Sequence, residues 1–474
     1  MKIRNRNQTR PGPGRWSQKL HRFGLIFSVF LLVAGLLAGP GPSRAQPQAE
    51  RRLVLSDVVI EGAGRTPRAT ILRHLGLEPG QTISQDALLD GVARLRDDHL
   101  FADVQFFTRP GPERGQLDLV LEVQEHAFNF RWGVGNTDID GWYVAPFLVE
   151  RRNFSGRADL LRLEWRLGFR HSGAYLRYQR PLGLDGRRYS ETRLAFLSTD
   201  RPYFSEGVEY RHQVDRGELG YVYGLRLSEN SLLESGLTVG TVESSHYSTA
   251  YNISPDGSIE EGDEIPLADQ PPGIAAAEGR SGRIALSMDW QRDTRGAGRR
   301  AGTPTHGTWG RIKGTLILQE DHSHPGLQAD LRAYREIPGG VLAGRVRGAW
   351  VGRKAAFYDR LYLGGMHTVR GFLTHSLSAP VGDTWLLSAS LEYRSRIMGE
   401  GDHTSLAGLF FLDAGLAGAD DVSDPYDELA ASLGYGVRFR IPWFDWVGVD
   451  VGFPLTDRPL DMRFQANASI GWSF

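Results

Sequence analysis

Residues 462–474 read MRFQANASIGWSF, and this stretch decides the fold class of the chain. Every second residue is apolar, and the residues between them are polar, charged or glycine. Because residues two apart lie on the same face of a β-strand, the pattern predicts a long strand with one apolar and one polar face. The apolar face would hold Met462, Phe464, Ala466, Ala468, Ile470, Trp472 and Phe474.

The same alternation recurs upstream, for example in residues 161–169, 342–350 and 385–393. A soluble β-sandwich has the same period, but its strands average only about 5–6 residues. Outer-membrane barrels use strands of about 10 residues, with large charged side chains facing a wet lumen. The length of these segments therefore favours an antiparallel transmembrane β-barrel over residues 126–474.

We count sixteen such segments between residues 127 and 474. Residues 207–226 would give a seventeenth if a turn divided them. Single-chain bacterial barrels prefer an even number of strands, so a 16-stranded barrel is predicted. Two connections are long, 247–279 and 352–382. The first is acidic, and we interpret it as a solvated surface loop.

The first 45 residues have the composition of a secretory signal peptide. They carry eight Lys/Arg and no acidic residue, and an apolar run over 23–37 precedes Ser43-Arg44-Ala45. That run is short for a transmembrane anchor, which needs about 20 apolar residues. We therefore predict a signal peptide over 1–45, a polar leader over 46–52 and an exported protein.

Without the signal segment the charge is negative, because residues 46–474 hold 47 basic and 56 acidic residues. This excess of acidic residues does not indicate nucleic acid as a partner. The chain has no cysteine, which excludes a disulfide scaffold, a cysteine-ligated zinc site and a cysteine nucleophile.

Residues 53–125 have a mixed α/β pattern. Strands are predicted over 53–61, 102–108 and 116–124, and two helices lie between the first two strands, one over 67–75 and one capped by Ser84. A segment of this length is sufficient for a small domain with a modest core.

The connection 352–382 contains Val369-Arg370-Gly371-Phe372. It is long enough to fold back into the lumen, where Gly371 would let the backbone approach the wall and Phe372 would supply an apolar anchor. A guanidinium in a partly dry lumen needs a carboxylate, because an unpaired buried charge costs several kcal/mol. On the strand alternation, Asp413 and Glu392 both point inward.

These residues, with Phe411-Leu412-Asp413-Ala414-Gly415 and a final Phe474, resemble the BamA/TamA superfamily, also called bacterial surface antigens. Residues 53–125 look like the POTRA domain of that family, with Val59-Ile60-Glu61-Gly62 and Val123-Gln124-Glu125 at matching positions. The resemblance implies a small α/β POTRA domain followed by a 16-stranded antiparallel transmembrane β-barrel. It also implies that Arg370 pairs with Asp413; Glu392 is the second candidate partner. Trp472 and Phe474 look like a C-terminal signal for membrane insertion.

The resemblance further implies a non-enzymatic outer-membrane protein that inserts proteins into the membrane or moves them across it. A periplasmic POTRA domain would receive the client polypeptide. The seam between residues 127–135 and 462–474 would open so that a client strand adds to it. The implied partners are the lipid bilayer, client polypeptides, and periplasmic or assembly-complex proteins. No cofactor and no metal are expected. The alternative role for Arg370 is a purely structural pin.

Other classes are weighed against this one. A two-partner-type secretion channel carries two POTRA domains and a plug helix, whereas only one POTRA fits here. A passive porin-like barrel would need neither a POTRA nor a pinned loop. For an enzyme, Asp321-His322-Ser323-His324 resembles a metal site only by composition, and Gly296-Ala297-Gly298 has the wrong spacing for a phosphate loop.

Overall fold

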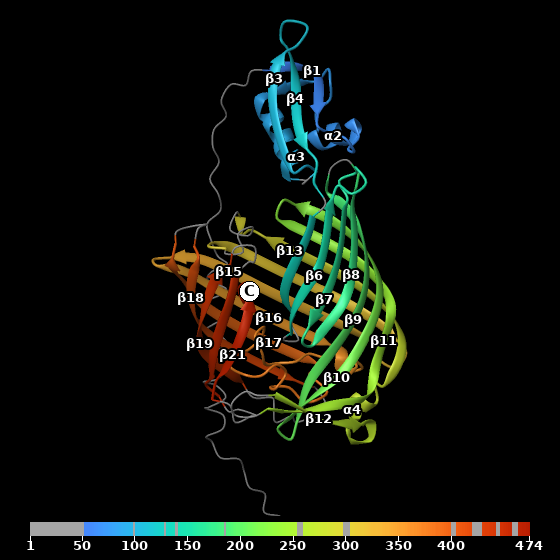
Figure 1. The fold of residues 1–474 in the computed structure, drawn as a ribbon, viewed down its shortest axis with the longest axis vertical. Helices are drawn as coiled ribbons and strands as arrows, with labels where there is room; N and C mark the ends of the chain where they lie inside the picture. The colour runs from blue at the N-terminus through green and yellow to red at the C-terminus, as the bar shows by residue number, and fades with distance from the viewer. Residues whose placement is uncertain are drawn as a thin grey trace, which may run out of the picture.

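The computed structural model describes residues 52–97, 100–127, 129–137, 141–183, 186–253, 259–296, 304–399, 404–419, 429–441, 446–456 and 463–474. A small α/β unit, residues 52–125, precedes a large β-barrel (Figure 1). The predicted signal peptide, 1–45, lies outside the described residues, as does the predicted leader up to residue 51.

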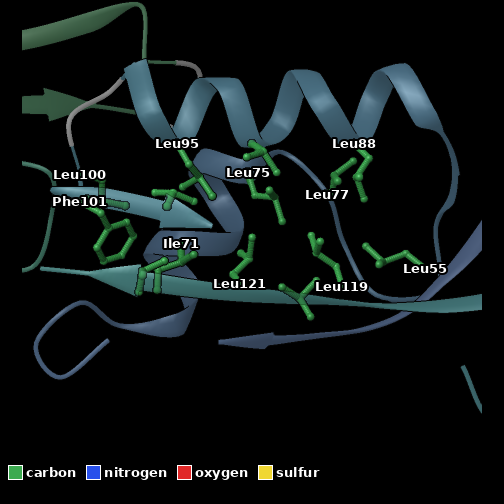
Figure 2. Close-up of a cluster of buried hydrophobic side chains, with 14 of the residues drawn as sticks. Leu55, Ile71, Leu75, Leu77, Leu88, Leu95, Leu100, Phe101, Leu119 and Leu121 are labelled. Atoms are coloured by element: carbon green, nitrogen blue, oxygen red, sulfur yellow. The ribbon is translucent and has the colours of Figure 1, made fainter. Parts of the chain in front are cut away.

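The N-terminal unit is a four-stranded sheet in the order β2-β1-β4-β3, with two helices packed against it. Strand β1 runs parallel to β4 and antiparallel to β2. Leucines from both helices and from β4 interlock to form the core (Figure 2). The elements are β1 (Arg52–Glu61), α2 (Arg68–Leu75), β2 (Thr82–Ser84), α3 (Gln85–Asp97), β3 (Asp103–Pro110) and β4 (Gln116–Gln124).

Local sequence explains where the two helices begin and end. Pro67 precedes α2, and Gly76 ends it with a φ of 68°, which is the left-handed conformation that glycine adopts without strain. The hydroxyl of Ser84 accepts a hydrogen bond from the backbone N–H of Ala87 at 3.1 Å and so caps α3. Strand β2 was not predicted, because three residues are too few to show a period.

The rest of the described chain forms a closed antiparallel barrel (Figure 1). The strand order places β21 next to β5. The predicted barrel is confirmed, but the predicted count of sixteen strands is wrong, because the described residues form seventeen strands of it. They are β5 (Asn129–Thr137), β6 (Gly141–Arg152), β7 (Leu160–Gly168), β8 (His171–Leu182), β9 (Arg188–Ser205), β10 (Val208–Ser228), β11 (Ser231–Ile253), β12 (Ile259–Pro266), β13 (Gly279–Asp293), β14 (Gly307–Gln319), β15 (His324–Ile337), β16 (Gly340–Val351), β17 (Trp385–Met398), β18 (Leu406–Gly418), β19 (Ala430–Arg440), β20 (Trp446–Pro454) and β21 (Gln465–Ile470).

The additional strand is β12, which pairs only with the last part of β11, from Tyr247 onward. Strand β13 pairs with the earlier part of β11, Ser231 to Ser244, and continues the wall. Two short helices follow β12, η1 (Leu267–Asp269) and α4 (Pro272–Ala275). Because Ile274 is fully buried in a cluster with Phe357 and Tyr358, the predicted solvated loop over 247–279 is instead partly ordered and packed.

The barrel wall has an apolar outer face and a polar inner face. Large apolar side chains such as Trp132, Trp165 and Phe410 are exposed on the outside, whereas charged residues such as Glu164 and Glu392 are buried on the inside. This is the alternation of a barrel whose outer wall contacts lipid. Among the described helices, none has the length and apolar character needed to cross a bilayer.

The last strand is much shorter than the sequence predicted. Strand β21 covers only Gln465–Ile470, and its pairing with β20 runs from Gln465 to Ile470. Gly471 then adopts a φ of 82° and turns the chain. Trp472 and Phe474 were predicted on the outer face, but Phe474 is buried inside the barrel against Tyr334. A single left-handed glycine breaks a period that looked continuous in sequence.

One rim of the barrel, here called the proximal rim, lies next to the N-terminal unit (Figure 1). The turn between β6 and β7, residues 153–159, makes the contact. The Asn153 side-chain amide donates a hydrogen bond to the Thr66 hydroxyl at 2.6 Å. Ala158 packs against the core of the N-terminal unit. Gly156 lies so close to Arg65 that an added Cβ would come within 2.7 Å of its carbonyl oxygen.

Glu125 fixes residues 65 and 66, which contact the turn between β6 and β7. Its carboxylate accepts hydrogen bonds from the backbone N–H groups of Arg65 and Thr66 and from the Thr66 hydroxyl. Partial burial would raise the pKa of Glu125, but these bonds and the Arg65 guanidinium outweigh it and lower the pKa to about 2. The contribution to stability is therefore complete above the ordinary pKa of 4.5 and is lost as the pH falls through about 2.

We expect Glu125→Gln to increase the hydrogen exchange of the Arg65 and Thr66 amides by at least about tenfold, since charge-assisted hydrogen bonds contribute roughly 1.5–3 kcal/mol. The matched control is Asp57→Asn, which removes an exposed ion pair with Arg68 in the same unit. The wild-type chain should lose the same protection between about pH 4.5 and 2, after correction for intrinsic exchange rates. Equal exchange in both variants would contradict a clamping role for Glu125.

Candidate functional site: a charged cluster in the barrel lumen

Residues 352–384 connect β16 to β17 and fold back into the lumen. Val369 and Phe372 are buried, and they pack with Leu363 of the same loop and with Leu386, Ala417 and Ala430 of the wall. The backbone N–H of Gly365 donates to the carbonyl of Phe372 at 3.2 Å, which closes the loop on itself. The loop is therefore held inside the barrel by an apolar contact on each side of Arg370.

Gly371 brings the tip of the loop against the wall. Its φ is 95°, and its Cα lies so close to β20 that an added Cβ on Gly452 would come within 2.7 Å of it. An added Cβ on Gly371 would in turn come within 3.1 Å of Ser432 on β19. Two glycines are needed because two backbones meet here without side chains between them.

Arg370 and Asp413 form a bidentate ion pair. The Nε of Arg370 lies 2.7 Å from Asp413 Oδ2, and its Nη2 lies 2.8 Å from Oδ1. The backbone N–H of Arg370 donates to the same carboxylate at 3.1 Å. Both side chains are 1% exposed, and the guanidinium stacks 3.7 Å from the centre of the Phe411 ring. Two parallel N–H···O bonds from a planar guanidinium to one carboxylate form the strongest geometry for such an ion pair.

Glu392 is also a partner of Arg370, at 2.7 Å from Nη1. The same nitrogen lies 3.4 Å from Asp450 on β20, and Nη2 donates to the Ser390 hydroxyl at 3.0 Å. The structure thus brings Arg370 together with both of the carboxylates that the sequence singled out, on β17 and β18.

Two further arginines complete what we call the central cluster. Arg394 donates to Glu392 at 2.8 Å, and Arg438 makes two bonds to Asp450, at 2.6 and 2.8 Å. Three guanidinium groups therefore face three carboxylates, so the buried charge is balanced. Balance matters because charges removed from water are tolerated only when they are paired and hydrogen-bonded. The cluster consists of Arg370, Glu392, Arg394, Asp413, Arg438 and Asp450.

The terminal segment, residues 472–474, is bound by the central cluster. The Ser473 hydroxyl lies between Arg370 Nη1, at 3.1 Å, and Glu392, to which it donates. Arg394 donates to the carbonyl oxygen of Phe474 at 3.0 Å and contacts the rings of Trp472 and Phe474. One cluster therefore connects the lumen loop, strands β17 to β20 and the end of β21.

Sequence reasoning missed Asp450, Arg438, Arg394 and Ser473. A usable signal existed for two of them, because Arg438 and Asp450 are charged inward positions on largely apolar strands. They are diagonal neighbours on β19 and β20, since Arg438 is opposite Gly448 and Asp450 is opposite Gly436. Ser473 lies on the polar face of the alternation, but its contact with Arg370 could not have been predicted, because it depends on the turn at Gly471.

This arrangement can hold a loop and a strand end in place. Within the described part of the chain, no group of three or more histidine or acidic side chains is arranged to hold a metal ion. The apolar outer wall, the charged lumen and the pinned inward loop define a transmembrane β-barrel protein with an internal ion-pair lock.

The chain belongs to the Omp85 superfamily, because the model of the Omp85 superfamily domain matches residues 153–474. The BamA/TamA-type family predicted from the motifs is therefore confirmed, and the chain is an outer-membrane barrel protein.

Three relatives illustrate the likeness. The chain is 27% identical over 116 residues to a protein of Treponema pallidum (strain Nichols) named as an outer membrane protein assembly factor; the match covers 23% of this chain and only 14% of that relative. The fold is similar to BamA from Haemophilus ducreyi lacking POTRA domains 1–3, with a TM-score of 0.66, 18% identity, and coverage of 89% of this chain and 85% of that one. It is also similar to CdiB from Acinetobacter baumannii, with a TM-score of 0.55, 16% identity, and coverage of 88% and 74%.

Proposed function

We propose that this protein inserts client polypeptides into the outer membrane, with residues 53–125 acting as a periplasmic POTRA domain and the β5–β21 seam as the place of insertion. The central cluster carries this proposal, because it ties the lumen loop to the terminal segment next to the seam. In this role Arg370 positions the end of β21. We assign no catalytic reaction.

The seam has the features of a weak junction. Strand β21 pairs with β20 over only six residues, from Gln465 to Ile470, whereas β10 and β11 pair over nearly their whole length. Strand β5 has an irregular register with β6 between Arg131 and Gly133. A short strand next to an irregular one leaves backbone N–H and C=O groups available, and a client strand can add to such an edge.

The N-terminal unit offers a second edge. Strand β3 is the outermost strand on one side of its sheet, and the Phe107 side chain there is 48% exposed, whereas Phe106 packs against the core. An exposed aromatic residue on an open edge is suited to binding an extended segment. Under the proposal this edge faces the periplasm and receives client or partner polypeptides before they reach the barrel. A photo-crosslinker at Phe107 would identify them.

A disulfide across the seam tests the proposal. The chain has no cysteine, so Val134→Cys on β5 can be combined with Ala466→Cys or Ala468→Cys on β21. We expect oxidation to abolish insertion of newly made outer-membrane proteins and reduction to restore it. The matched control is Leu286→Cys with Leu316→Cys, which are directly opposite each other on the stably paired β13 and β14. Full activity of the oxidised seam variant would remove the insertion mechanism.

Secretion of a polypeptide through the lumen is the second candidate, since the polar, charged inner face of the wall is suited to line such a path. The two candidates differ in what the seam does. A secretion channel would remain active with the seam locked, provided that the lumen loop can still move. The same oxidised variant therefore distinguishes them, with secretion of a soluble client as the second measurement.

A further inference from the structure

Three arginines lie side by side on the inner wall of the barrel. Arg162 on β7 is directly opposite Arg177 on β8, and Arg177 is directly opposite Arg193 on β9. Like charges at opposite positions of neighbouring strands are destabilising. We call Arg162, Arg177 and Arg193 the arginine row.

Too few carboxylates accompany these guanidinium groups. Glu191 is shared by Arg177 and Arg193, and Glu164 is shared by Arg162 and Arg166. Glu150 lies within 3.8 Å of three arginines, Arg131, Arg152 and Arg162. Six guanidinium groups of β5 to β9 therefore share three carboxylates, in contrast to the balanced central cluster.

The two kinds of charge differ in exposure. The side chains of Arg177 and Arg193 are 42% and 50% exposed, whereas Glu191 between them is fully buried. Arg162 is 35% exposed and its partner Glu164 only 5%. The nearest other carboxylate to Arg193 is Glu234, 3.9 Å away, which accepts the Tyr189 hydroxyl. A molecule in the lumen thus meets guanidinium groups with the acids behind them.

The row lies near the proximal rim, because Arg162, Arg177 and Arg193 are each within six residues of the strand end on that side. The N-terminal unit contacts the same rim through the turn between β6 and β7. The arginine row and the contact with the N-terminal unit therefore lie at the same rim of the barrel.

We propose that the arginine row is a binding surface for an extended, acidic polypeptide segment. Neighbouring strands are about 4.8 Å apart, so the row presents three cations over roughly 10 Å. Side chains on one face of an extended segment repeat every ~6.6 Å, so two or three Asp or Glu residues at alternate positions can reach the row. Exposed guanidinium groups also donate to backbone carbonyls, which acidic small ions do not offer.

Only the naming of a polypeptide as the ligand rests on the proposed function. The binding of carboxylates can be measured without any client or assembly reaction. Peptide binding can therefore be absent while the oxidised seam variant loses activity as proposed. Conversely, the peptide can bind even if the oxidised seam variant stays active.

The test uses the full chain in detergent and a fluorescent ten-residue glutamate peptide, with binding followed by anisotropy. We expect the peptide to bind and its affinity to fall as salt is raised, whereas a ten-residue lysine peptide should not bind. The variant Arg177→Gln/Arg193→Gln should weaken binding by roughly tenfold, since each exposed charge pair contributes up to about 1 kcal/mol. Arg396→Gln, which removes an equally exposed arginine on β17, should leave binding unchanged.

Each of the following results would overturn the proposal: equal binding of the lysine peptide, unchanged affinity in the double variant, or equal loss in Arg396→Gln. Competition by free glutamate at the same carboxylate concentration as the peptide would also overturn it, because the row would then be a general anion site. Folding of each variant is checked by its heat-modifiable mobility. If the double variant does not fold, Arg177→Gln and Arg193→Gln are measured separately, and each should weaken binding about threefold.

Discussion

Arg370→Ala is expected to eliminate most of the folded barrel, which would be seen as loss of the heat-modifiable form on electrophoresis while export continues. The substitution leaves Asp413 and Glu392 buried without their central cation. Breaking a buried ion pair by removing one partner costs about 3–5 kcal/mol, which is a large part of the ~5–15 kcal/mol by which a domain is stable.

The matched control for this variant is Arg396→Ala. Arg396 lies on β17 like Glu392, but it is 51% exposed and lies 3.8 Å from an equally exposed Glu336. Its removal should change stability by less than about 1 kcal/mol. Arg370→Lys should not restore the barrel, because an ammonium cannot make the two parallel bonds to Asp413. A normal yield of folded Arg370→Ala protein would show that the lumen loop does not depend on the central cluster.

Gly452→Ala is expected to release the lumen loop from the wall. Its added Cβ would lie 2.5 Å from the backbone nitrogen of Gly371 and 2.7 Å from its Cα. Neither position belongs to a flexible side chain, so the loop backbone must move, and such overpacking costs roughly 1–3 kcal/mol. Arg370 immediately precedes Gly371 in the chain. A shift of the Gly371 backbone would therefore also disturb the bidentate contact between Arg370 and Asp413.

The measurement is limited proteolysis of residues 352–384 in the folded barrel, together with the yield of that barrel. Gly314→Ala is the control, because Gly314 lies on β14 and an added Cβ there meets nothing within 4 Å. We expect the loop of the Gly452 variant to be cleaved at least about tenfold faster than that of the control. Equal cleavage rates would mean that close backbone approach at Gly371 is not what holds the loop.

Much of the fold was predictable because it follows from periodicity. The alternation in residues 385–393 and 462–474 indicated strands with one apolar face, and the wall of the structure follows that rule. The count failed at β12, because this strand lies within the acidic segment 247–279, whose composition predicted a loop. The acidic segment 247–279 was judged by composition alone, which does not reveal that Ile274 packs against Phe357.

The candidate site was partly predictable for a different reason. A buried arginine requires a carboxylate, so Asp413 and Glu392 could be chosen as inward-pointing acids on neighbouring strands. Asp450 and Ser473 come from strands distant in sequence, and their approach to Arg370 depends on how the loop enters the lumen. The need to pair a buried charge predicts that a carboxylate lies near Arg370, but only the closed barrel shows which carboxylates do.

A barrel with an inward loop could be inferred from the amino-acid sequence, because a period of two is a local property and a buried arginine has a chemical need for a carboxylate. The position of residues 472–474, in contrast, follows only from the folded arrangement. Residues 472–474 continue the alternation of a lipid-facing strand, yet Gly471 turns them toward Arg370 and Arg394. The position of this segment depends on Arg370, Glu392 and Arg394, which come together only when the barrel closes. No local sequence pattern contains that information.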